Sequence, residues 1–174
     1  MNDLLGRKLA RMRADFVFPH IRGRLLDIGC GNNELVRRYQ NGVGADVFDW
    51  GDIDLLISDP ARLDFEPGSF DTITIIAAFN HIANRKEVLK ECYRVLAADG
   101  RLIITMISPV VGLIWHKLRF PWDSDQKVRG MKAGEVYGLS GAQILGLARM
   151  GNFVLENRQR FMAGFNTMYI FKKN

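Results

Sequence analysis

The sequence predicts an α/β fold: a doubly wound sheet of about seven strands, mostly parallel with an antiparallel C-terminal strand, and helices on both faces. Short apolar runs alternate with helix-favouring segments over residues 24–107, a pattern typical of β-α-β units. A Gly-x-Gly turn follows the first apolar run, at residues 29–31. Two strand-like runs, 153–161 and 166–172, close the chain around a glycine-containing turn. They predict an antiparallel hairpin.

Composition is that of one globular domain spanning residues 1–174. Hydrophobic residues make up 48% and charged residues 25% of the 174, values usual for such domains. Cys30 and Cys92 cannot form a disulfide framework, so we expect a reducing, cytoplasmic location. The N-terminus has no signal-peptide core. The longest apolar run, 102–115, is too short to span a membrane. Scattered histidines and cysteines predict no metal site.

Positive charge is concentrated locally within a net charge of +5. Basic residues gather in the first 24 positions and again over 117–132. Such groups suit RNA, an anionic membrane surface or an acidic substrate. For the first group, a solvated helix face is the favoured interpretation.

The first two β-α-β steps follow from the apolar pattern. Residues 3–18 have near-helical apolar spacing and predict an N-terminal helix within 1–22, packed on the domain edge or over a ligand site. Strands are expected at 25–28, 43–47 and 54–59, with a helix over 33–40. Only residues 47–53 separate the second and third strands, whereas a crossover with a helix needs about 10–12 residues. We therefore predict that this helix is missing, which leaves Phe48 and Trp50 as a ligand-site wall or a plug of the sheet edge.

The second half continues the alternation and then interrupts it. The sequence predicts a strand at 70–76, a helix over 85–97 begun by Asn84, a turn at Asp99-Gly100 and a strand at 101–107. Residues 108–139 have no periodicity but many apolar and aromatic side chains, which predicts a lid or substrate-binding insertion. Ser140 is expected to cap a last helix, 141–150.

Two glycines and one carboxylate indicate a nucleotide-like ligand. Gly29 and Gly31 allow a tight turn and close approach of a ligand to the backbone. Asp46, at the tip of the second strand, can accept two hydrogen bonds from a vicinal diol such as that of ribose. An ordinary strand–helix loop and a turn aspartate are the alternative interpretation.

In combination these segments resemble the class I S-adenosylmethionine-dependent methyltransferases (methyltransferase type 11-like), whose fold is Rossmann-like. The resemblance covers residues 22–107 well and the last two strands by order. It is carried by the following stretches: Leu25-Leu26-Asp27-Ile28-Gly29-Cys30-Gly31, Gly44-Ala45-Asp46, Ser58-Asp59-Pro60-Ala61-Arg62-Leu63-Asp64-Phe65, Ser69-Phe70-Asp71 and Glu91-Cys92-Tyr93-Arg94-Val95-Leu96 before Asp99-Gly100.

The resemblance implies S-adenosylmethionine as cofactor, S-adenosylhomocysteine as product and a role for each matching residue. Asp27, Gly29 and Gly31 would hold the methionine part, with Cys30 in the same loop. Asp46 would bind the ribose and Val47 the adenine. Asp59 would accept from the adenine amino group, and Asn80 and His81 would lie near the sulfonium and the methyl acceptor.

Three departures from the family pattern stand out. Asn33 replaces the third motif glycine, and Ala98-Asp99-Gly100 replaces the usual Pro-Gly-Gly before the fifth strand. The shortened second crossover would leave the adenosine pocket more open than usual.

The acceptor is predicted to be a small, lipophilic or lipid-linked molecule. The fourth strand ends in Ala77-Ala78-Phe79-Asn80, without the Asn/Asp-Pro-Pro-Tyr of relatives that methylate amino groups. His81 could act as a general base; a structural histidine is the alternative. Residues expected to meet the substrate are Trp115, His116 and Tyr137, with Glu135 a weaker candidate base. We expect no nucleic-acid partner, and leave peripheral membrane contact and the oligomeric state open.

Three other functions stay open. The basic N-terminal helix favours an RNA methyltransferase. A nicotinamide-dependent oxidoreductase is disfavoured because Glu34 stands where Gly-x-Gly-x-x-Gly needs its last glycine. A non-catalytic relative that binds only the cofactor is also compatible, since methyl transfer requires no invariant nucleophile.

Overall fold

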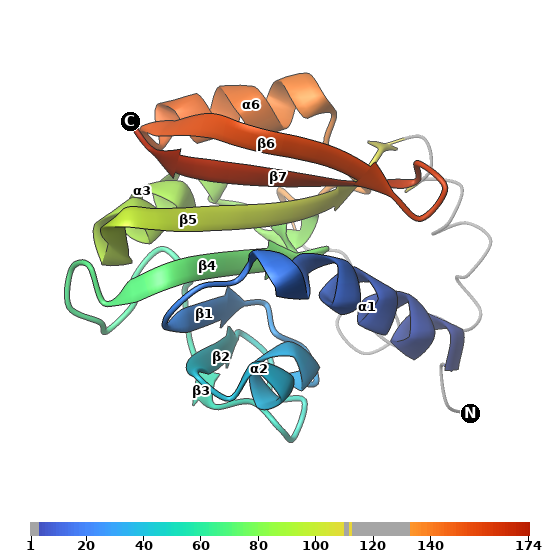
Figure 1. Cartoon of the computed structure of the whole chain (residues 1–174), viewed down its shortest axis with the longest axis horizontal. Helices are drawn as coiled ribbons and strands as arrows, with labels where there is room; N and C mark the ends of the chain where they lie inside the picture. Colours follow the sequence, from blue (N-terminus) through green and yellow to red (C-terminus); the bar gives the residue numbers. More distant parts are fainter. Residues whose placement is uncertain (1–3, 110–111, 113–132) are drawn as a thin grey trace.

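A single mixed sheet organises the computed structural model, which describes residues 4–109, 112 and 133–174. Within these residues seven strands lie in the order β3-β2-β1-β4-β5-β7-β6 (Figure 1). Strand β7 runs antiparallel to both of its neighbours, and the other pairs are parallel. The strands are β1 (Leu25–Ile28), β2 (Gly42–Asp46), β3 (Leu55–Leu56), β4 (Phe70–Ile76), β5 (Leu96–Ile107), β6 (Phe153–Phe161) and β7 (Asn166–Lys173). The predicted α/β fold is confirmed.

Helices cover both faces of the sheet (Figure 1). On one face, α1 (Leu4–Val17) and α2 (Glu34–Tyr39) pack in one apolar cluster; on the other, α3 (Arg85–Val95) and α6 (Gly141–Met150) pack in a second. Alternation along β1 divides its side chains between them, because successive residues of a strand point to opposite faces: Leu25 joins the α1–α2 side, and Leu26 and Ile28 join the other. Short 3₁₀ turns follow α1 at Phe18–His20 and β4 at Phe79–His81.

The two predicted helix starts behave differently. Ser140 caps α6 as expected: its Oγ accepts from the Gln143 N–H at 3.3 Å, and the Gln143 side chain accepts from the Ser140 N–H. Asn84 holds the position before α3, but its side chain makes no cap and instead donates to Asp59 Oδ1 at 3.0 Å. The side chain of Asn84 therefore joins α3 to the segment after β3.

The prediction of a turn at Asp99-Gly100 is wrong. Strand β5 begins at Leu96 and includes both residues. Leu96 pairs with Phe70 of β4, and a register irregularity between Phe70 and Thr72 accommodates the polar residues. Residues 97–100 therefore form an irregularity within β5, between the paired residues Leu96 and Arg101.

The second crossover contains no helix, as predicted. Residues 47–54 link β2 to the two-residue β3 without any helical segment. Asn33 helps to hold this link: its fully buried side chain donates from Nδ2 to the Asp52 carbonyl oxygen at 3.2 Å. A Cβ at Gly44 would lie 1.9 Å from Asn33 Oδ1, so the asparagine fits only against a glycine.

Most of the predicted insertion, 108–139, lies outside the described residues. Of its described part, Leu139 is buried and the Val136 N–H donates to the Asn80 carbonyl oxygen at 3.0 Å. This contact brings residues 134–137 to the end of β4. Among the described residues, no helix has the length and apolar character needed to cross a membrane.

Candidate functional site

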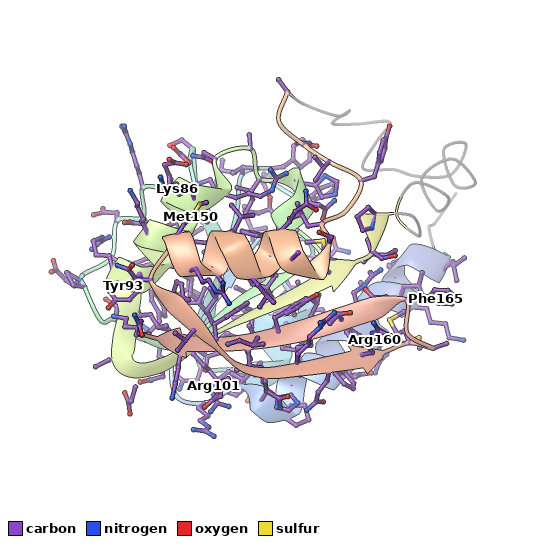
Figure 2. The ribbon with its side chains drawn as sticks, turned by 90° about the horizontal axis from the view of Figure 1, so that it is seen from above. Lys86, Tyr93, Arg101, Met150, Arg160 and Phe165 are labelled. Carbon is purple, nitrogen blue, oxygen red and sulfur yellow. The ribbon has the colours of Figure 1, made fainter. Side chains whose placement is uncertain are left out.

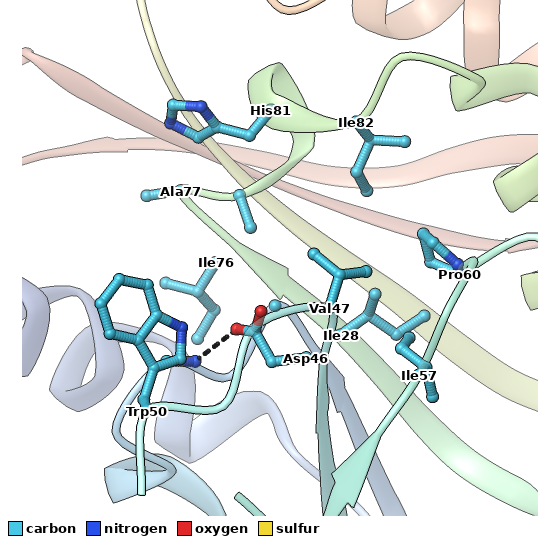
Figure 3. A pocket seen from close by; sticks show the side chains of 13 residues that line it. Ile28, Asp46, Val47, Trp50, Ile57, Pro60, Ile76, Ala77, His81 and Ile82 are labelled. Atoms are coloured by element: carbon cyan, nitrogen blue, oxygen red, sulfur yellow. Dashed lines mark hydrogen bonds between the residues drawn. The ribbon is translucent and has the colours of Figure 1, made fainter. Parts of the chain in front are cut away.

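A cavity of about 200 Å³ opens at the carboxyl ends of β1, β2 and β4 (Figure 3). Open α/β sheets bind ligands at this edge. Four of the residues predicted for the cofactor, and the predicted base, line it together. The lining residues are Ile28, Gly29, Gly31, Asp46, Val47, Trp50, Ile57, Pro60, Ile76, Ala77, Ala78, His81 and Ile82.

Gly29 and Gly31 differ in the space that a side chain would have. Both have positive φ, +74° at Gly29 and +55° at Gly31, a region that other residues adopt at a cost. A Cβ at Gly29 would lie 2.6 Å from the Cβ of Ala78, whereas one at Gly31 would meet nothing within 4 Å. Gly29 therefore lets the loop pack against the end of β4, and Gly31 leaves backbone facing open space.

Asp46 forms the polar edge of the cavity. Its Oδ2 accepts from the Gly31 N–H at 3.0 Å, the dashed line in Figure 3, and its Oδ1 accepts from the Phe48 N–H at 3.1 Å. The carboxylate thus joins the glycine loop to the segment after β2. Each carboxylate oxygen can accept more than one hydrogen bond, so both retain capacity for the hydroxyls of a diol.

Apolar side chains form the remaining walls. Val47 and Trp50 come from the segment after β2, and Ile57 and Pro60 from the segment after β3. Trp50 therefore lines the cavity, with Phe48 packed against it at a ring-centroid distance of 4.7 Å. The sequence left the role of Trp50 open and gave no periodic signal for Ile57 or Pro60.

A second carboxylate, Asp27, lies on β1 next to the lining residue Ile28. It is 3% exposed and accepts from the Thr74 hydroxyl at 2.6 Å. The pKa of Asp27 is raised to about 7, mainly by burial; the Thr74 hydrogen bond lowers it, and the negative charge of Asp46 adds a smaller upward contribution. Near neutral pH Asp27 therefore exchanges its proton readily, and a nearby cation would favour its ionised form.

Cys30 does not line the cavity. Burial and the charges of Asp27, Asp46 and Asp54 all raise the pKa of its thiol. Since the thiolate is the nucleophilic form, Cys30 is poorly suited to covalent chemistry.

Asp59, predicted to meet the adenine amino group, is not among the lining residues. Its Oδ1 accepts from the Ala61 N–H at 2.9 Å and from Asn84 Nδ2 at 3.0 Å, and these bonds lower its pKa. It precedes the lining residue Pro60, so its role toward a ligand stays a prediction.

His81 lines the cavity (Figure 3) and pairs with Glu135. The distance from His81 Nδ1 to Glu135 Oε2 is 3.2 Å, and the Glu135 side chain is only 2% exposed. A carboxylate can only accept, so Nδ1 carries the hydrogen. The pair therefore fixes the ring orientation and assigns proton acceptance to Nε2.

A network of hydrogen bonds holds the two halves of this pair together. Arg85 donates from Nη2 to the carbonyl oxygens of Asn80, at 2.9 Å, and Gly134, at 3.0 Å. Buried Asn80 donates from Nδ2 to the Val136 carbonyl oxygen at 3.2 Å. Asn80 thus supports the pair and is not among the residues that line the cavity. The role of Arg85 was not predicted, because an arginine at a helix start carries no sequence signal for such a role.

Of the three predicted substrate residues, only Tyr137 lies within the described residues. Tyr137 is 39% exposed and does not line the cavity. Trp115 and His116 lie outside the described residues.

These residues fit a nucleoside cofactor. A carboxylate beside a glycine backbone matches a ribose diol, and an apolar slot matches a base. The buried carboxylate Asp27 adds negative charge suited to a cationic ligand.

Comparison with known families supports the same assignment. The family model described as "Methyltransferase domain" matches residues 26–104. The chain is 25% identical over 143 residues to the ubiquinone/menaquinone biosynthesis C-methyltransferase of Pseudomonas savastanoi pv. phaseolicola, with 67% of this chain and 56% of that protein covered. It is 28% identical over 136 residues to the demethylmenaquinone methyltransferase of Paenarthrobacter aurescens, covering 68% and 53%. The chain thus spans about half the length of these curated relatives.

Solved structures share the fold. A SAM-dependent methyltransferase from Thermotoga maritima aligns with a TM-score of 0.69 at 16% identity, covering 95% of this chain and 92% of that one. A protein from Pyrococcus horikoshii OT3 aligns with a TM-score of 0.72 at 19% identity, covering 99% and 93%. The family model and the solved structures both point to a methyltransferase domain. Residues 26–104 are thus similar to a methyltransferase domain, and the described part of the chain has the fold of solved SAM-dependent methyltransferases. This chain combines a helix-free second crossover with a His–Glu pair at the cavity.

Proposed function

We propose that this protein transfers a methyl group from S-adenosylmethionine to a small lipophilic acceptor. The observation that carries the proposal is the cavity at the sheet edge, where Asp46 and the glycine loop meet apolar walls and His81 is one of the lining residues. When bound, S-adenosylmethionine supplies an electrophilic methyl group on a sulfonium sulfur. Asp46 and Gly31 would hold its ribose, and Val47 and Trp50 its adenine.

The nature of the acceptor follows from the cavity near His81 and from the relatives. Apart from His81, the lining residues near it, Ile76, Ala77 and Ile82, are apolar (Figure 3), which favours an apolar acceptor. The names of the curated relatives point to quinones, and we propose an acceptor related to this class in its reduced, hydroquinone form, a ring with a phenolic hydroxyl. Methylation at carbon or oxygen of such a ring releases one proton.

His81 would remove that proton. Its Nε2 would accept the acceptor's hydrogen while Nδ1 donates to Glu135, whose negative charge stabilises the imidazolium that forms. Holding the reactants in line in a water-poor cavity would supply much of the remaining acceleration.

Methyl transfer from radiolabelled S-adenosylmethionine to a series of hydroquinones and phenols, with and without prenyl tails, tests the proposal. His81→Asn should lower kcat by about a hundredfold or more, within the range of general-base catalysis, and leave cofactor affinity unchanged. Glu135→Gln keeps an acceptor for Nδ1 but removes the negative charge, so kcat should fall less than in His81→Asn. If both variants transferred the methyl group as fast as the unaltered protein, a role for the His81–Glu135 pair would be contradicted.

A further inference from the structure

Helix α1 carries an apolar stripe that the protein's own core uses only at one end. Leu5, Leu9, Met12 and Phe16 recur at helical spacing. The last of these, Phe16, stacks on Phe161 with ring centroids 4.2 Å apart. Toward the N-terminus the stripe emerges: Met12 is 42% and Leu5 52% exposed. An amphipathic helix that hides only part of its apolar stripe has surface available for a partner.

The turn between β6 and β7 extends the exposed stripe. Phe165 at this turn is 55% exposed. The hydrogen bond from Arg13 Nε to Asn166 Oδ1, at 3.1 Å, ties the turn to the middle of α1. We call Leu5, Met12 and Phe165 the corner patch.

The corner patch lies at the same sheet edge as the cavity. Asn166, next to the turn, pairs with Ile107 at the carboxyl end of β5. Two residues earlier on β5, Thr105 accepts a hydrogen bond from the N–H of Ala77, which lines the cavity. In Figure 1 the N-terminal half of α1 and the β6–β7 turn both lie at the right, where β5 ends.

Basic side chains border the patch. Arg7, Lys8 and Arg11 are all exposed on α1. Arg160 is exposed on β6, and Figure 2 shows it at the same end of the molecule as Phe165. Of these, Arg11 has an acidic neighbour, Glu34, at 3.7 Å. Apolar side chains flanked by lysine and arginine are typical of helices that lie in a membrane interface.

We propose that the corner patch docks the protein on an anionic lipid surface, with the cavity edge toward the lipid. This inference rests on the proposed function, because an acceptor with a prenyl-like tail resides in the bilayer. The charge complementarity between the arginine–lysine border and acidic headgroups favours lipid over a protein partner. The apolar contribution is small, so attachment is reversible.

Vesicle co-sedimentation of the full chain tests this inference. We expect binding to vesicles of phosphatidylcholine with phosphatidylglycerol, weaker binding to phosphatidylcholine alone, and weakening by salt. Leu5→Glu/Met12→Glu should lower the partition coefficient about tenfold or more, and Arg7→Glu/Lys8→Glu should abolish the preference for phosphatidylglycerol. The matched control is Met150→Glu, on α6 at the opposite end of the molecule from Phe165 (Figure 2) and 58% exposed; it should bind as the unaltered protein does.

Two results would overturn the docking proposal. One is a failure of the vesicle test: the patch variants partition as the control does, or the unaltered protein does not bind vesicles at all. The other is a dimer, seen by analytical ultracentrifugation, that Leu5→Glu/Met12→Glu dissociates without any effect on vesicle binding; the patch would then join two copies. Calorimetric titration of the same preparations with S-adenosylmethionine separates the two proposals, because loss of docking with cofactor binding intact contradicts only the docking.

Discussion

At the residue scale, the buried Asp27 couples stability to pH. Its pKa is about 7 in the folded protein against 3.8 in its ordinary state, so the folded state holds the proton to higher pH. The protonated Asp27 carboxyl therefore makes a favourable contribution to the free energy of unfolding. This contribution is fully present below about pH 4 and is lost as the pH rises toward about 7. Above that pH the folded protein carries a buried, ionised carboxylate.

Replacing this carboxyl with an amide should remove the pH dependence that it causes. Asp27→Asn keeps an oxygen to accept from Thr74 and cannot ionise, so it should stabilise the protein more at about pH 8 than at about pH 5. Urea unfolding at the two pH values measures this difference, with Asp64→Asn, at an exposed position, as the control. A difference no larger than that of the control would show that Asp27 does not couple stability to pH.

The two loop glycines offer a matched pair of substitutions. Gly29→Ala introduces both a strained φ and a clash with Ala78, so we expect a loss of unfolding free energy of about 2 kcal/mol or more. Gly31→Ala has the strain without the clash and should cost about 1 kcal/mol. Because its methyl group would enter the cavity edge, Gly31→Ala should weaken S-adenosylmethionine binding out of proportion to its effect on stability. Urea unfolding measures the loss of stability and calorimetry the loss of S-adenosylmethionine affinity. Equal losses of both in the two variants would contradict the different roles of Gly29 and Gly31.

At the element scale, the segment after β2 supplies a cavity wall in place of a crossover helix. Trp50 packs on Phe48 and lines the cavity, while the fold's core lies elsewhere. Trp50→Ala should therefore weaken cofactor binding about tenfold, near the value of one aromatic contact, with little loss of stability. Calorimetry and thermal unfolding report the two quantities. A large fall in stability with unchanged affinity would instead identify Trp50 as a plug of the sheet edge.

Elements were predictable where local pattern and tertiary pairing agree. Strand β4 and helix α6 have their predicted bounds, because an apolar β-branched run and a serine cap act locally. At Asp99-Gly100 the local preference predicts a turn, but the structure has strand there. The pairing of Leu96 with Phe70, which the sequence does not reveal, overrides the local preference. Likewise Asn84 stands at a helix start, yet a distant carboxylate, Asp59, takes its side chain.

At the scale of the whole molecule, the strand order determines which residues meet. Placing β1 between β2 and β4 brings Gly31, Asp46 and His81 to one cavity although 50 positions separate the first from the last. Gly31 was predicted from the Gly-x-Gly turn, Asp46 from its place at a strand tip, and His81 from the family resemblance. The sequence could not predict the pairing of His81 with Glu135 or the wall formed by Ile57 and Pro60, because both depend on how distant segments pack.

The central claim is that the cavity at the sheet edge binds S-adenosylmethionine through Asp46. Calorimetric titration with S-adenosylmethionine and S-adenosylhomocysteine tests it most directly, using the unaltered protein, Asp46→Asn and the control Asp49→Asn, an exposed carboxylate three positions away. NADH serves as the competing ligand. The account predicts binding of both sulfur ligands, loss of that binding in Asp46→Asn, retention in Asp49→Asn and no binding of NADH. Absence of binding by the unaltered protein, or equal affinity in the two variants, would contradict it.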